Sequence, residues 1–393
     1  MIAKPTRRKF AYLALSLALL SALSAALLLL LREDRVLERV LSRGYLRCGV
    51  NGSLPYFSER KSAVDADGFY LEASGFDADF CRVVAIAVFG TYSNTLRFKD
   101  LNAGNRFAAL RNGEIDVLIR NTTWTASRDT GQGVDFTAIT LYTGQKFLVR
   151  RDAGIEKLSD LAGKAICVQP GNPSARTSTY LNLVDLNAGF FTADELAEPV
   201  VITEKGPGEP FANNEETFKA FLAGECKAIT SGVDQLEAYF APQPERRGEY
   251  RLIPERPIAN EPRGPVVVSN DSQWRDIVSY AAWATIYAEE LGVDSTNLAT
   301  YLGNSSLRYK KFLGIADEHI PSDQYIGTKL GIAPDFALQI IKQMGSYGEI
   351  YQRNLSSIMP ERDANSINQH FDQSQHVWQL IENGGQLFSP PFE

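Results

Sequence analysis

The strongest constraint on the fold is a helix–glycine–strand unit that occurs twice in the chain. Four identities, each separated by 111 residues, relate Phe107 to Phe218, Ala109 to Ala220, Gly113 to Gly224 and Glu114 to Glu225. In each copy a short amphipathic helix is followed by a glycine that can take the left-handed conformation ending a helix, and then by an apolar strand. The repeat predicts two related lobes. The alternative is that two unrelated units share the pattern by chance.

Strands and helices also alternate upstream of both copies. The expected strand, helix and strand lie at residues 45–50, 77–89 and 95–98 in the first half, and at 165–169, after Pro173 and at 199–203 in the second. Such alternation forms open, mostly parallel sheets, whose ligands bind beyond the carboxyl ends of the strands. The sequence therefore predicts an α/β chain in which the strand ends of two lobes face a ligand-binding cleft.

A polar segment with one arginine follows the apolar strand of the first unit, residues 115–119. The segment runs from Asn121 through Thr122 and Thr123 to Arg128. A guanidinium offers a rigid fork of donors that matches the two oxygens of a carboxylate, and threonine hydroxyls and backbone N–H groups can satisfy the remaining lone pairs. The pattern predicts a carboxylate site centred on Arg128. The alternative is a surface loop in which Arg128 forms an ordinary salt bridge.

Composition narrows the class of protein. With 393 residues, of which 44% are hydrophobic, the chain can bury two sizeable cores. Its net charge of -7 gives no electrostatic reason to expect nucleic acid as a partner. The three histidines have no spacing typical of metal ligands, and no glycine-rich phosphate loop is present. We therefore expect no metal and no cofactor.

The N-terminus predicts export. Basic residues at positions 4–9 precede a run of 22 residues, 10–31, that is apolar except for three serines. Positive charge keeps the N-terminus in the cytoplasm, so the rest of the chain is expected in the periplasm. A membrane-spanning helix needs about 20 apolar residues, whereas the apolar core of a signal peptide has only about 7–15. The length favours an uncleaved inner-membrane anchor. The alternative is a signal peptide cleaved after Ala22-Leu23-Ser24.

Eight short motifs follow one another along residues 36–391. Their combination, in this order, is specific for one family of proteins. They are Cys48-Gly49-Val50-Asn51, residues 75–82, 105–110, 120–128 and 134–137, Glu261-Pro262-Arg263-Gly264-Pro265, Tyr347-Gly348-Glu349-Ile350 and Asn383-Gly384-Gly385. A chain with these motifs resembles family 3 of the periplasmic solute-binding proteins, most closely the general L-amino acid-binding components of ABC transporters.

The resemblance implies a type II periplasmic-binding-protein fold of two lobes joined by a hinge near residues 140–144 and 262–265. The expected parts are a signal peptide or anchor at 1–35, the first lobe at 36–142, the second lobe at 143–262, and a return to the first lobe with a helical C-terminal extension at 263–393. In that extension we expect an amphipathic helix with one apolar face, formed by Trp274, Ile277, Val278, Ala281, Ala282 and Ile286.

The resemblance also implies which residues bind the ligand. Arg128 occupies the position that binds the ligand carboxylate, with Asn121, Thr122 and Thr123 beside it. Asn51 and Tyr56 match positions near the ligand side chain, although plain packing is the alternative for Tyr56. In the second lobe Asn172 and Ser174 lie at an expected helix start, where anions are attracted.

One departure from the family concerns the ligand ammonium. Relatives place an aspartate after the third strand of the second lobe, whereas this chain has Gly232, with Asp234 two residues later. An ammonium left unpaired in a closed site would be costly. Either Asp234 or another acid replaces the missing group, or the ligand differs.

The four cysteines fit an oxidising compartment. Four cysteines allow three pairings. Because two precede the expected hinge and two follow it, we predict one disulfide in each lobe, Cys48 with Cys81 and Cys167 with Cys226. The alternative is that some remain buried thiols.

The sequence thus predicts a binding protein that captures an amino acid or related carboxylate and presents it to the permease of an ABC transporter. A dehydratase on the same fold is a second hypothesis, for which Glu59, Glu72 and Asp234 are the candidate acids. A third hypothesis is a ligand-sensing domain tethered to the membrane.

Overall fold

A computed structural model describes residues 35–168, 200–202, 204–206, 209–210, 214–303, 306–359, 390 and 392. The chain divides into two units, Met1–Arg43 and Gly44–Glu393. Of the first unit, the described residues form α2 (Val36–Arg43). The apolar run at 10–31 lies outside the described residues. Within the described ranges, no helix is both long and apolar enough to cross a membrane.

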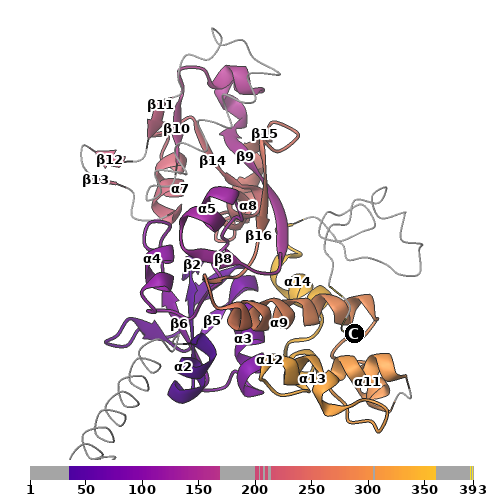
Figure 1. Cartoon of the computed structure of the whole chain (residues 1–393). Helices are drawn as coiled ribbons and strands as arrows, with labels where there is room; N and C mark the ends of the chain where they lie inside the picture. The colour runs from indigo at the N-terminus through magenta and orange to yellow at the C-terminus, as the bar shows by residue number, and fades with distance from the viewer. Residues whose placement is uncertain are drawn as a thin grey trace, which may run out of the picture. The chain divides into compact units, whose positions relative to one another are not determined.

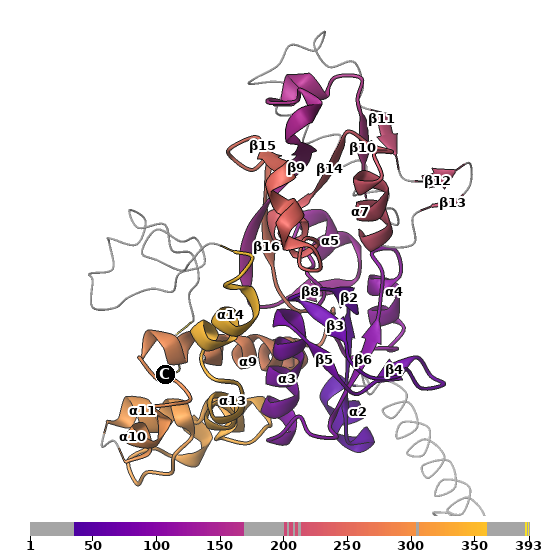
Figure 2. The same ribbon diagram turned by 180° about the vertical axis from the view of Figure 1, so that it is seen from behind.

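The second unit contains two large sheets (Figures 1 and 2). The first has the strand order β4-β6-β1-β7-β17-β8. Its strands are β1 (Leu46–Val50), β4 (Phe69–Tyr70), β6 (Leu96–Asp100), β7 (Val117–Leu118), β8 (Val134–Phe136) and β17 (Val266–Val268). β1 is parallel to both β6 and β7, as the alternating pattern predicted, and β17 joins the sheet antiparallel.

The long helix of the first half, α3 (Phe76–Phe89), is fixed at both ends by glycines. Gly75 has φ 119°, and a Cβ there would overlap the backbone of Phe57, so only glycine fits before the helix. Gly90 ends the helix in the left-handed conformation, with its N–H donating to Ile86 O. The helix predicted at 77–89 is confirmed.

The second sheet has the order β11-β10-β14-β9-β15, with β16 also paired to β9. Its strands are β9 (Leu141–Arg150), β10 (Ala165–Cys167), β11 (Val200–Ile202), β14 (Ala228–Gly232), β15 (Tyr250–Ile253) and β16 (Ala259–Arg263). β10 is parallel to β11 and β14, and β9 runs antiparallel to β14. The helix expected after Pro173 lies outside the described residues.

Both copies of the repeated unit fold as predicted. In the first, α4 (Arg106–Arg111) and Gly113, with φ 67°, precede β7. In the second, α7 (Asn214–Leu222) and Gly224, with φ 86°, precede β14. Each unit therefore places a strand in the middle of one sheet, and the residues that follow the two strands are comparable positions.

Two segments cross between the sheets, and they pair with each other. β16 runs antiparallel to the start of β9, with Arg263 opposite Leu141 and Glu261 opposite Thr143. These are the segments predicted as the hinge, at 140–144 and 262–265. Their pairing sets the side chains of β16 beside both sheets, while the hinge motion itself remains a prediction.

The C-terminal region is helical and packs on α3. α9 (Ser272–Glu290) and α13 (Phe336–Met344) contact each other and α3, and α14 (Tyr347–Leu355) joins them (Figure 2). The six apolar residues predicted to face the core of α9 are all buried. Trp274 is fully buried, and its Nε1 donates to Asp116 O over 2.8 Å.

Smaller elements complete the part of the chain that the structure describes. The short strands are β2 (Ser53–Leu54), β3 (Ser58–Arg60), β5 (Ala73–Ser74), β12 (Glu204–Gly206) and β13 (Glu209–Pro210), and the remaining helices are α5 (Ala126–Gly131), α8 (Val233–Ala238), α10 (Leu298–Leu302), α11 (Leu307–Leu313) and α12 (Ile326–Leu330). Among the described residues, 3-10 turns lie at Arg151–Ala153, Leu158–Leu161, Pro244–Glu249 and Ser322–Gln324.

The cysteines pair within each half of the chain. Cys48 is bonded to Cys81, which joins β1 to α3, and Cys167 is bonded to Cys226, which joins β10 to the segment before β14. The predicted pairing is confirmed, and no cysteine is left as a free thiol. Each bridge fastens a helix-containing segment to a sheet strand that precedes a candidate ligand-binding residue.

Candidate functional site

Arg128 lies in the short helix α5, directly after the polar segment predicted from the sequence. Thr125 caps the helix, and its Oγ1 accepts a hydrogen bond from the Arg128 N–H. Arg128 Nη1 donates to Thr123 O over 2.8 Å, which orients the guanidinium towards its own polar segment. Within the described chain, Nε and Nη2 donate no hydrogen bond to the protein, so they remain available for a ligand oxygen.

The residues before α5 are held from two directions. The Asn121 N–H donates to Asp77 Oδ2 over 2.8 Å, and Asn121 has a positive φ of 32°. Thr122 Oγ1 donates to Arg120 O over 2.8 Å, within its own turn. Thr123 forms an isolated antiparallel bridge with Arg263. These contacts hold the segment that we predict as the cradle around Arg128, and the bridge ties it to β16.

Four arginines lie close enough in this region to influence one another's charge. They are Arg106, Arg120, Arg128 and Arg263. Burial lowers the pKa of Arg120 to about 10, and burial also lowers the pKa of Arg106 and of Arg128. Such a concentration of buried positive charge is stable only if anions lie beside it.

Three carboxylates supply part of the compensating charge. They belong to Asp77, Asp234 and Glu261. Asp77 is buried, and burial raises its pKa to about 7, although the Asn121 N–H and the Arg263 charge oppose the shift. Because four guanidinium groups face three carboxylates, one of them half-protonated near neutral pH, the region keeps an excess of positive charge. That excess favours an anionic group on the ligand.

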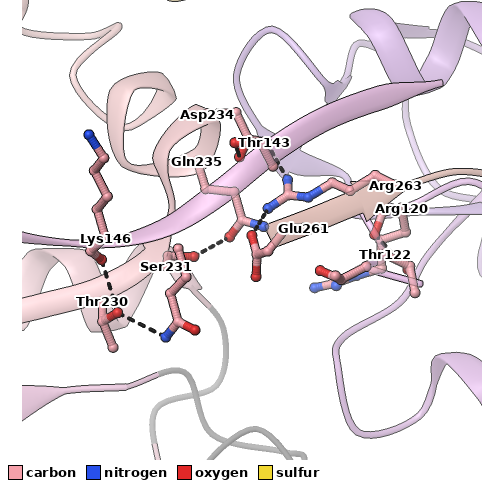
Figure 3. A network of polar contacts seen from close by, with 12 residues as sticks. Arg120, Thr122, Thr143, Lys146, Thr230, Ser231, Asp234, Gln235, Glu261 and Arg263 are labelled. Atoms are coloured by element: carbon pink, nitrogen blue, oxygen red, sulfur yellow. Dashed lines mark hydrogen bonds and ion pairs between the residues drawn. The ribbon is translucent and has the colours of Figure 1, made fainter. Parts of the chain in front are cut away.

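Arg263 is the centre of an ion-pair network (Figure 3). Its Nη1 donates to Asp234 Oδ2 and its Nη2 donates to Glu261 Oε2, the latter over 2.8 Å. Thr143 Oγ1 donates to the other oxygen of Asp234 over 3.1 Å. The network therefore joins β16 to the start of α8 and to β9.

Glycine at position 232 leaves room for this network. Gly232 ends β14 and caps α8, and a Cβ built on it would overlap Arg263 Nη2, Glu261 Oε2 and Asp234 Oδ1. The network fills the space that a larger residue would need. Asp234, the predicted substitute for the family's aspartate, is fully buried, and both of its oxygens accept hydrogen bonds from protein groups.

The other predicted ligand-binding residues do not form one group with Arg128. Asn51 follows β1, where its Oδ1 accepts from Ser53 Oγ and its N–H donates to Ser58 Oγ. Tyr56 is half-buried and has a positive φ of 66°. Asn172 and Ser174 lie outside the described residues, so their role stays a prediction.

Reasoning from the sequence missed five charged residues of this region. They are Asp77, Arg106, Arg120, Glu261 and Arg263. All five lie within the motifs of the resemblance, but the pattern assigned them no role. A usable signal was present at Arg120, a charged residue that directly follows a buried apolar strand.

The acids proposed for a dehydratase are poorly placed for proton transfer in a buried site. Glu59 is half-exposed and pairs with Lys61 over 2.8 Å, and Glu72 is exposed. Asp234 is buried but ion-paired. Among the described residues, no cluster of histidine, cysteine or acidic side chains could hold a metal ion.

Two open, mostly parallel sheets with charged residues near their strand ends are typical of proteins that bind small ligands beyond those ends. Comparison with known sequences gives the same class. The model of the bacterial extracellular solute-binding proteins, family 3, matches residues 46–357. The chain therefore belongs to this family.

Several relatives are similar over nearly the whole chain. The general L-amino acid-binding periplasmic protein AapJ of Rhizobium johnstonii is 38% identical over 90% of this chain and 92% of its own length. The glutamate/glutamine/aspartate/asparagine-binding protein BztA of Rhodobacter capsulatus is 34% identical over 91% of this chain and 93% of its own length. A periplasmic binding protein from Brucella ovis, solved with glutathione bound, aligns with a TM-score of 0.73 and 34% identity, covering 92% of this chain and all of that one.

Proposed function

We propose that this protein is the extracytoplasmic substrate-binding component of an ABC transporter for amino acids. The observation that supports this most strongly is Arg128, which is fixed by Thr123 O and Thr125 and keeps guanidinium donors for a carboxylate. The names of the relatives AapJ and BztA point to amino acids, and glutathione in the Brucella ovis relative also carries a free amino-acid end.

The proposed mechanism is ligand-driven closure without chemistry. Arg128 would bind the ligand carboxylate from the first sheet, and residues at the ends of β10 and β14 would contact the same ligand. Contacts that exist only when the lobes meet shift the population towards the closed form, which the permease recognises.

Arg128→Ala is expected to abolish most of the ligand affinity. Each charge-assisted hydrogen bond contributes about 1.5–3 kcal/mol, so the loss of a bidentate contact should weaken binding by about 100-fold or more. The measurement is a thermal-shift scan of the wild type with the twenty L-amino acids and glutathione, followed by calorimetric titration of the wild type and the variant.

Arg275→Ala is the matched control, because Arg275 is an exposed arginine paired with Asp276. It should bind as the wild type does. A wild-type protein with no shift for any amino acid or for glutathione would refute the proposed ligand class. Unchanged affinity in Arg128→Ala would refute the assignment of the carboxylate site.

For the localisation, we propose that residues 10–31 remain attached to the protein as an inner-membrane anchor. We expect the intact mass of the exported protein to include these residues, and the protein to stay with the membrane fraction after high-salt washing. A mass corresponding to cleavage after Ser24, with the protein in the soluble periplasmic fraction, would show that the segment is a signal peptide.

A further inference from the structure

The ligand of this site, if it is an amino acid, needs an acidic residue to bind its ammonium group. Three carboxylates lie near the arginines, and two of them are buried. Asp234 is fully buried and accepts from Arg263 and Thr143. Asp77 is buried, and its Oδ2 accepts from the Asn121 N–H. Asp234 could serve a ligand ammonium only by giving up a buried partner, which is costly. Asp77 is 5% exposed, and burial raises its pKa to about 7, so it offers a ligand little surface and only part of a charge.

Glu261 differs from both. Its side chain is 19% exposed, compared with 0% for Asp234. Its Oε2 accepts from Arg263 Nη2 over 2.8 Å, while within the described chain Oε1 accepts no hydrogen bond from a protein group. One oxygen thus fixes the carboxylate, and the other is open to a ligand.

The backbone places Glu261 beside the carboxylate site. Glu261 pairs with Thr143 across the β16–β9 ladder, two residues before Arg263, whose own backbone bridges Thr123. Its charge lies near enough to Arg128 to raise the pKa of that guanidinium against the effect of burial. An anionic and a cationic group side by side match the two charged groups of an amino acid.

Glycine at position 232 makes this arrangement possible. A Cβ at Gly232 would overlap Glu261 Oε2, so the carboxylate occupies space that any larger residue there would take. Figure 3 shows Glu261 reaching from β16 into the region between Ser231 and Arg120. The carboxylate of Glu261 therefore lies close to the place that the side chain of an acid at position 232 would occupy.

We propose that Glu261 is the ammonium-binding residue of this site, and that Arg263 positions it. The inference rests on the proposed function and deepens it: the ligand is an α-amino acid whose carboxylate contacts Arg128 and whose ammonium contacts Glu261 Oε1. In this arrangement an acid on β16 takes the role of the acid that relatives have at the position of Gly232, and the site still recognises an amine.

The test compares Glu261→Gln with the wild type against a pair of ligands. The pair is the L-amino acid that binds most tightly in the thermal-shift scan and the 2-hydroxy acid with the same side chain. Glutamine keeps the shape of the residue and removes its charge. We expect the variant to bind the amino acid about 10- to 100-fold more weakly and the hydroxy acid no more weakly than the wild type does.

Glu255→Gln is the matched control, because Glu255 is an exposed acid in the segment before β16. It should leave both affinities unchanged. If Glu261→Gln folds poorly, Glu261→Asp keeps the charge beside Arg263 and withdraws it by one methylene, and the same selective loss is expected.

The outcomes separate the two proposals. Equal weakening for both ligands, or no weakening, would overturn the role of Glu261 while leaving the amino-acid assignment intact. A wild type that binds the hydroxy acid as tightly as the amino acid would also overturn it, since no amine would then be recognised. A wild type that binds neither ligand would instead refute the proposed function.

Discussion

Replacing Arg263 with methionine is expected to lower the free energy of unfolding by about 3–5 kcal/mol at neutral pH. The side chain is only 3% exposed, and it is the cationic partner of Asp234, whose side chain is 0% exposed. Methionine fills much of the same volume, so little packing is lost. What remains is a buried carboxylate whose hydrogen-bond donors are the neutral Thr143 hydroxyl and the Gln235 backbone N–H, and an uncompensated buried charge is strongly destabilising.

Urea unfolding of the single and double variants measures this effect. In Arg263→Met with Asp234→Asn the orphaned charge is gone, so the double variant should be more stable than Arg263→Met alone. The unfolding free energies of the wild type, the two single variants and the double variant form a double-mutant cycle, which gives the coupling energy between the two residues. Additive effects, or a loss below about 1 kcal/mol in the single variant, would mean that Arg263 and Asp234 do not form a buried pair.

The features predicted well from the sequence depend on local pattern. The repeated helix–glycine–strand unit, the parallel pairing of β1 with β6 and β7, and the buried face of α9 all follow from periodicity within one segment. Arg128 was singled out in the same way, because its motif lies in one short stretch next to a strand, and its role in ligand binding stays a prediction. The disulfides followed because each pairs cysteines from one half of the chain.

The Arg263 network could not be found by such reasoning. Arg263 contacts Asp234, 29 residues away, and bridges Thr123, far earlier in the chain. These contacts depend on the register of β16 against β9. A shift of one residue in this register would turn the side chains of β16 to the other face of the sheet. In the sequence, Gly232 stands where relatives have an aspartate. In the folded chain it is the space that three charged side chains require.

The same dependence on tertiary structure applies to Asp77. In the sequence it is an acid in the first turn of α3, where a carboxylate is ordinarily exposed and favourable. In the fold it is buried under the polar segment of the ligand site and accepts the Asn121 N–H. Burial raises its pKa to about 7, while an aspartate in the unfolded chain titrates near pH 3.9. The folded protein therefore binds more protons than the unfolded chain between about pH 4 and pH 7.

This proton uptake fixes the sign of a pH effect. Where the folded state binds more protons, stability falls as pH rises, so ionisation of Asp77 should destabilise the wild type progressively from about pH 4 to pH 7. A difference of about 3 pKa units corresponds to on the order of 4 kcal/mol above pH 7. Asp77→Asn removes the ionisation, and its amide oxygen can still accept the Asn121 N–H.

Asp77→Asn is therefore expected to gain stability relative to the wild type as pH rises, by about 2–3 kcal/mol between pH 5 and pH 8. Urea unfolding of both proteins at these two pH values measures the change. Asp323→Asn, which alters an exposed carboxylate far from the arginines in the chain, should run parallel to the wild type. Parallel curves for Asp77→Asn would mean that Asp77 is ionised in the folded protein at pH 5 at little cost. The surrounding arginines would then be compensating it fully, and at neutral pH the positive excess that we assign to a ligand carboxylate would be smaller by about half a charge.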